Sequence, residues 1–152
     1  MRLFITIEAQ NCTENGLADI LRETNEKLSF LNDKSLEDID NYGKEFRFIT
    51  IIPSCMDDDF WDGLGWKERK QIWRKKGEAD IRLRMDYDRF MSETLENKYL
   101  LFYDIIVKSI NVVRERSKAD FNGKQLIKDV LFALNVSEQD LEQLNNKRNV
   151  SI

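Results

Sequence analysis

The spacing of apolar residues predicts strands in the first half of the chain and helices mainly in the second half. Leu3, Ile5 and Ile7 alternate with other residue types, and this period of two predicts a first strand. A run rich in β-branched and aromatic residues at 46–52 predicts a second strand. That strand should end at Pro53, because proline cannot donate a backbone hydrogen bond to a sheet.

Two more strands are expected at residues 70–74 and 79–87, joined near Gly77. Glycine accepts the positive φ that a tight hairpin turn requires, so these strands should pair with each other in antiparallel fashion. In the second of them, Arg82 and Arg84 fall on the face opposite the apolar residues. Such a face is either solvated, with its charges paired across strands, or directed at a partner.

Helical spacing of apolar residues marks four further segments. They are residues 15–31, 95–113 and 123–134, and a last helix that contains Leu141 and Leu144. Ser137 and Asp140 have the spacing of a capping box at the start of this last helix. We therefore predict an α+β domain, with a small and mostly antiparallel sheet of about four strands packed against helices and a C-terminal helical pair.

Length and composition favour one soluble domain. A chain of 152 residues with 41% hydrophobic residues can bury a core without disulfides or a structural metal, so we treat residues 1–152 as a single domain. Cys12 and Cys55 lack metal-site spacing, and reduced thiols are expected, with one long-range bridge as the alternative. No stretch approaches the roughly 20 apolar residues of a membrane span, and no signal peptide is evident. We expect a cytoplasmic protein without metal or cofactor.

Charge is distributed unevenly along the chain. Residues 1–65 carry 6 Lys and Arg against 14 Asp and Glu, residues 66–89 carry 9 against 5, and residues 90–152 carry 9 of each. An acidic first half favours encounter with a basic partner. The central excess of cations is too mixed in sign to follow a phosphate backbone. Charge therefore favours a protein partner over nucleic acid.

The segment after the second predicted strand combines carboxylates, aromatic rings and glycines. Carboxylates make directional charge-assisted contacts, and large rings are frequent anchors at protein interfaces. The alternative is that the rings fold back onto the core, because exposed large aromatics are uncommon without a partner. The predicted partner-binding residues are Asp57, Asp58, Asp59, Phe60, Trp61, Asp62 and Trp66, with Arg82 and Arg84 as a second patch.

Two rival functions fit parts of the sequence. Residues 129–141 have the spacing of a helix-turn-helix, which leaves a regulator or adaptor open. Its second helix would begin with Glu138, Asp140 and Glu142, whose carboxylates are repelled by phosphates. An enzyme is less favoured, because the chain has no histidine and no phosphate-binding glycine motif. Only carboxylate-dependent chemistry would remain, and no pair of carboxylates stands out.

The central part of the chain also resembles a known family. Arg74-Lys75-Lys76, the alternating residues 78–87, and a following helix with Ile105-Ile106 and Lys108-Ser109-Ile110 carry the resemblance. They are similar to small bacterial immunity proteins of polymorphic-toxin and contact-dependent growth inhibition systems. The likeness spans about residues 44–113 plus the first strand. It implies a non-enzymatic inhibitor of the C-terminal toxin domain encoded beside it, often a nuclease, and it leaves self-association open.

Overall fold

The structure is a computed structural model, and it describes residues 2–5, 17–37, 42–43, 48–54, 78–84, 87–117 and 121–150. Most of these residues are helical. In chain order the elements are β1 (Arg2–Ile5), α1 (Leu17–Glu37), β2 (Phe48–Ser54), β3 (Glu78–Arg84), α2 (Tyr87–Ser92), α3 (Leu95–Arg116), α4 (Gly123–Leu134) and α5 (Glu138–Val150).

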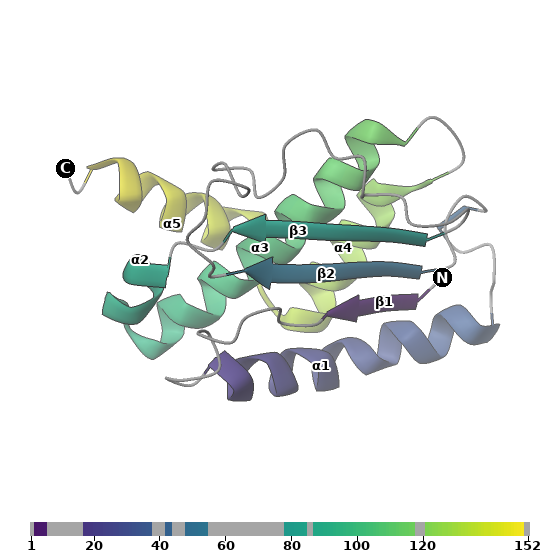
Figure 1. The fold of residues 1–152 in the computed structure, drawn as a ribbon, viewed down its shortest axis with the longest axis horizontal. Coiled ribbons are helices and arrows are strands. Elements are labelled where there is room, and N and C mark those ends of the chain that lie inside the picture. Colours follow the sequence, from purple (N-terminus) through teal and green to yellow (C-terminus); the bar gives the residue numbers. More distant parts are fainter. Residues whose placement is uncertain are drawn as a thin grey trace.

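The three strands form one parallel sheet in the order β1-β2-β3 (Figure 1). In the register of β2 and β3, Ile49 pairs with Ala79 and Ile51 pairs with Ile81. All four residues are buried. Because successive residues of a strand point to opposite faces, these four define the face of the sheet that belongs to the core.

The predicted fold class is wrong. We expected an α+β domain with about four mostly antiparallel strands, whereas the described part of the chain is predominantly helical and its three strands are parallel. β3 pairs with β2 in parallel, and the expected hairpin arm at residues 70–74 lies outside the described residues. The alternation of residues in a strand reports its two faces but not the direction of its neighbour. β2 also continues through Pro53 to Ser54.

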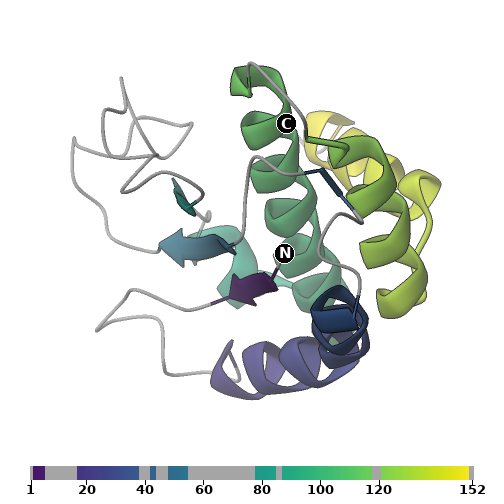
Figure 2. The ribbon, with the colours of Figure 1, turned by 90° about the vertical axis from the view of Figure 1, so that its right-hand side faces the viewer.

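The central element of the core is α3. It contacts β2 and β3 on one side and α4 and α5 on the other, so the helices behind it form a further layer (Figure 2). α1 packs beside β1 and against α4. Along α3 the fully buried apolar residues recur every three or four positions, as an amphipathic helix requires. They are Phe102, Ile106, Ile110 and Val113.

Local signals define the turn between α4 and α5. α4 has the predicted bounds, Gly123–Leu134, and Asn135 follows it in the left-handed conformation with φ 57°. The Val136 N–H donates to the Leu131 carbonyl at 3.1 Å, which closes the end of the helix. The predicted capping box is confirmed, because the Ser137 N–H donates to Asp140 Oδ2 at 2.9 Å and the Asp140 N–H donates to Ser137 Oγ at 3.1 Å.

Candidate functional site

Most of the binding residues predicted from the sequence lie outside the residues that the structure describes, so they stay predictions. Asp57, Asp58, Asp59, Phe60, Trp61, Asp62 and Trp66 lie outside the described residues, as do Cys12 and Cys55. Arg82 and Arg84 belong to β3, where the register places them beside Ile52 and Ser54 of β2. Both residues therefore belong to the part of β3 that pairs with the carboxyl end of β2.

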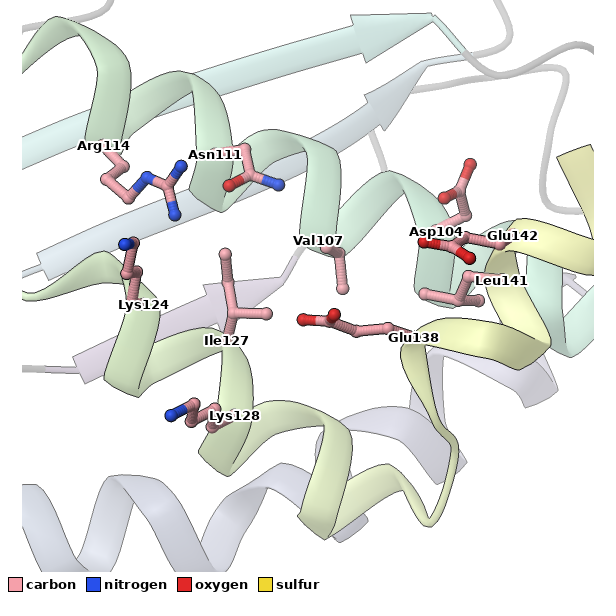
Figure 3. A pocket seen from close by; sticks show the side chains of 10 residues that line it. All are labelled: Asp104, Val107, Asn111, Arg114, Lys124, Ile127, Lys128, Glu138, Leu141 and Glu142. Atoms are coloured by element: carbon pink, nitrogen blue, oxygen red, sulfur yellow. The ribbon is translucent and has the colours of Figure 1, made fainter.

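A different candidate site lies among the helices, and we call it the interhelix pocket. α3, α4 and α5 surround this open space of about 410 Å³ (Figure 3). Each helix contributes one apolar residue to its lining, namely Val107 from α3, Ile127 from α4 and Leu141 from α5. Ile127 and Leu141 are buried, and Val107 is half-buried. These three side chains give the pocket an apolar part of its lining.

The two ends of the interhelix pocket differ in charge. Arg114, Lys124 and Lys128 lie at one end, while Asp104 and Glu142 lie at the other (Figure 3). Glu138 extends from α5 toward the middle. Asp104 pairs with Lys108 of its own helix, with Nζ and Oδ2 2.7 Å apart. Among the described residues, no ion pair joins the cations of the pocket to its carboxylates.

The rims of the pocket follow one spacing on two helices. In α4, Lys124 is followed by Ile127 at i+3 and Lys128 at i+4; in α5, Glu138 is followed by Leu141 and Glu142 in the same way. Residues three and four positions apart share a helix face. Each of these two helices thus contributes one buried apolar residue and two charges of one sign to the pocket. This repeated spacing can be read from the sequence. The sequence does not show that residues of α3 line the same pocket.

The helix dipole favours the position of Glu138 on α5 but disfavours the position of Lys124 on α4. Glu138 lies in the first turn of α5, where the helix dipole stabilises a carboxylate. Lys124 lies in the first turn of α4, where the same dipole disfavours a cation. Like charges at i and i+4 cost about 0.2–0.5 kcal/mol in isolated helices, on α5 as on α4, so the dipole is what distinguishes the two helices. The basic end is therefore assembled against the local preference of α4.

Close packing of α4 on α3 positions that basic end. Gly123 is buried at the start of α4, and a Cβ at this position would lie 2.9 Å from Phe121 Cε1 and 3.0 Å from Arg114 Cβ. Carbon atoms without a bond between them do not approach so closely without displacement of a neighbour. The glycine therefore permits the observed contact between the start of α4 and the stem of Arg114.

Tyr42 fixes the opposite side of α4. Its hydroxyl donates to Asp129 Oδ2 at 2.6 Å, and its carbonyl accepts from the Asn122 N–H at 2.8 Å. Tyr42 is buried, and this burial, together with the Asp129 carboxylate, raises the pKa of its phenol well above the ordinary range. The neutral phenol thus anchors α4 from outside the pocket at physiological pH.

The chemistry that this site offers is that of contact with a partner. Its side chains supply opposite charges separated by an apolar surface, which suits recognition of a polypeptide. In the part of the chain that the structure describes, no three His, Cys, Asp or Glu side chains come together as a metal site. No described helix is long and apolar enough to cross a membrane.

Comparison with known proteins places the chain among the immunity proteins of toxin systems. It belongs to the immunity protein 44 family, whose family model matches residues 1–136. The match confirms the resemblance drawn from residues 44–113 and the first strand, and it extends that resemblance to α1 and α4. α5 begins at Glu138, beyond the matched residues. Neither the curated proteins nor the solved structures provide a match.

Proposed function

We propose that this immunity protein binds a cognate toxin domain and neutralises it by a non-covalent protein–protein interaction. The observation that carries the proposal is the family match over residues 1–136. The expected partner is the C-terminal toxin domain of the protein encoded immediately upstream, and the expected place of encounter is the cytoplasm. Membership in a family of immunity proteins favours a binding role over an enzymatic one.

The acidic and aromatic segment at residues 57–66 is the first proposed contact surface, with Arg82 and Arg84 as its second patch. Ser54, the last residue of β2, pairs with Arg84, the last residue of β3. The segment at residues 57–66 follows Ser54 closely in the sequence. This closeness in sequence supports the assignment of both patches to one surface.

The charge of the first half of the chain supports a basic toxin. Residues 1–65 carry 14 acidic residues against 6 basic ones. A negative surface accelerates encounter with a positive one and competes with nucleic acid for it. A toxin that acts on nucleic acid would present such a basic surface, so a nuclease is the toxin class that we propose.

The helix-turn-helix alternative is disfavoured by the exposed carboxylates of α5. α4 and α5 do follow each other through a short capped turn. However, Glu138, Asp140 and Glu142 are all exposed at the start of α5. These groups would meet the phosphates of DNA in the position of a recognition helix, where like charges repel.

Co-expression with the upstream C-terminal domain tests the proposed function. The two chains should purify as a stable complex, and the immunity protein should restore growth to cells that express the toxin domain. The matched control is an unrelated toxin domain of the same class, which should neither bind nor be neutralised. If the upstream domain neither forms a complex nor loses its toxicity, the proposal for this partner is wrong.

A single truncation tests the proposed surface at residues 57–66. Trp61→Ala should weaken toxin binding by about 2 kcal/mol or more if the ring is an interface anchor, because central aromatic residues dominate binding energy. Leu95→Ala is the matched control, since Leu95 is an exposed apolar residue on α3 that lies outside both proposed patches. Unchanged affinity of a folded Trp61→Ala protein would remove this segment from the interface.

A further inference from the structure

We infer that the interhelix pocket is a second toxin-binding surface, which receives a segment of the toxin carrying an acidic side chain, an apolar side chain and a basic side chain in that order. The inference rests on the proposed function and names a different surface for the same partner. The acidic group of the toxin would meet Lys124 and Lys128, and its basic group would meet Glu142.

The interhelix pocket keeps its positive and negative side chains apart. Surface charges that stabilise a fold usually pair locally with the opposite sign, although each exposed pair is worth little. Here Lys124 and Lys128 lie at one end of the pocket, Glu142 lies at the other end and Glu138 extends toward the middle. Among the described residues none of the four pairs across the pocket. Two rims of opposite sign favour one orientation of a bound segment.

An exposed aromatic ring, that of Phe132, lies beside the basic end of the pocket. Phe132 follows Lys128 by four residues on α4, so it lies next to that rim on the same helix face. Its exposed fraction is 83%, and it stands out among the described apolar residues together with Leu95. A large ring that is exposed next to an open pocket has the character of an interface anchor.

The lining of the pocket favours a polypeptide over other ligands. Nucleic acid would be repelled by Glu138, which extends into the middle of the pocket, and by Glu142. Small-molecule sites usually enclose their ligand and converge a few polar groups on it. This pocket is open, and its charged groups are spread along its length, with Glu138 near the middle beside Val107 and Ile127 (Figure 3).

The acidic rim gives the pocket a role in partner choice. Glu138 and Glu142 lie beyond the residues that the family model matches, whereas Lys124 and Lys128 lie within them. Charges on the rim of an interface exclude wrong partners more than they add affinity.

Inverting the polarity of the pocket tests this inference. The double variant Lys128→Glu with Glu142→Lys exchanges the two signs and preserves the net charge of the chain. Its matched control is Arg22→Glu with Glu26→Lys, which makes the same exchange at two exposed positions of α1. Binding is measured with the purified upstream C-terminal domain, and folding of each variant is checked by circular dichroism and thermal unfolding.

The inverted variant should bind about tenfold more weakly or worse, because each reversed charge meets its own sign. The control pair should stay within about twofold of the wild type, as expected for charges outside an interface. A folded inverted variant with wild-type affinity would overturn the inference while leaving the proposed function intact. A wild-type protein that neither binds nor neutralises this domain would instead overturn the proposed function for that partner.

A truncation keeps the test decisive if the inverted variant does not fold. Phe132→Ala changes only an exposed side chain and should also weaken binding about tenfold or more, whereas Leu95→Ala should not. Light scattering measures the oligomeric state and so tests the alternative that a second copy of the chain occupies the pocket. If the wild type is a dimer that Phe132→Ala converts to a monomer with unchanged toxin affinity, the pocket serves self-association and the inference is wrong.

Discussion

Two faces of α3 differ in how deeply their side chains are buried and in the chemistry of those side chains. One face carries Phe102, Ile106 and Ile110, which are completely buried. The other carries Val107 and Arg114, which are half-buried and line the interhelix pocket. The first face contributes apolar burial to the core, and the second presents mixed chemistry to an open space. α3 thus supplies a core face and, on the inference above, a face for toxin contact.

The largest expected effect is the difference in unfolding free energy between substitutions on these two faces. Ile106→Ala should lower the free energy of unfolding by about 2–5 kcal/mol, because it leaves a cavity in a packed core. The neighbouring change Val107→Ala removes part of a half-buried side chain and should cost about 1 kcal/mol. Urea unfolding followed by circular dichroism measures both. Equal costs for the two substitutions would show that the pocket face is as important to the core as the buried stripe.

The next effect concerns the packing that places Arg114 at the basic end of the pocket. Gly123→Ala should destabilise the protein by about 1–3 kcal/mol, because the added Cβ would overlap Phe121 and the stem of Arg114. Lys124→Ala is the matched control on the next residue of α4, and its effect should stay within about 0.5 kcal/mol. Alanine favours helix more than glycine does, so a stabilised Gly123→Ala protein would show that the close approach is not required.

Much of the helical part of the fold was predictable because its signals are local. The spacing of apolar residues located α3 and gave the bounds of α4, and residues 137–140 identified the start of α5. The class of the sheet was not predictable in the same way. The alternation of residues in β3 indicates its two faces but does not indicate whether β2 runs parallel or antiparallel to it. Parallel pairing requires a long connection between the two strands.

The candidate site was predictable only in part, because its spacing on each helix is local while the packing of the helices is not. The spacing of Lys124 with Lys128 and of Glu138 with Glu142 is present in the sequence, and each pair defines a helix face by itself. That the two faces border one pocket depends on how α4 and α5 pack on α3, which is a tertiary property. The segment at residues 57–66 remains a prediction from residue type.

A smaller effect is expected at the turn that joins the two rims. Asn135 has a left-handed backbone with φ 57°, a conformation that costs most residues about 1–2 kcal/mol. Asn135→Ala should therefore destabilise the protein by about 1 kcal/mol, while Asn135→Gly should be neutral or slightly stabilising. Thermal unfolding of the pair measures the difference. If alanine is tolerated as well as glycine, the turn does not hold α5 in place against the pocket face.

The smallest effect is a pH dependence on the core side of α3. The Tyr99 hydroxyl donates a hydrogen bond to the Glu23 carboxylate of α1. This hydrogen bond, with a smaller contribution from burial, raises the pKa of Tyr99 from 10 to about 12. The unfolded chain therefore loses this proton at lower pH than the folded one. The resulting contribution to stability is complete below pH 10 and is lost as the pH rises toward about 12.

Tyr99→Phe isolates that contribution, because the variant keeps the ring of Tyr99 and the other tyrosines of the chain. The difference in unfolding free energy between wild type and variant should be constant below pH 10 and should shrink between pH 10 and about 12. Urea unfolding at a series of pH values measures it. A difference that stays constant across this window would mean that the contact between α3 and α1 does not depend on the protonated phenol.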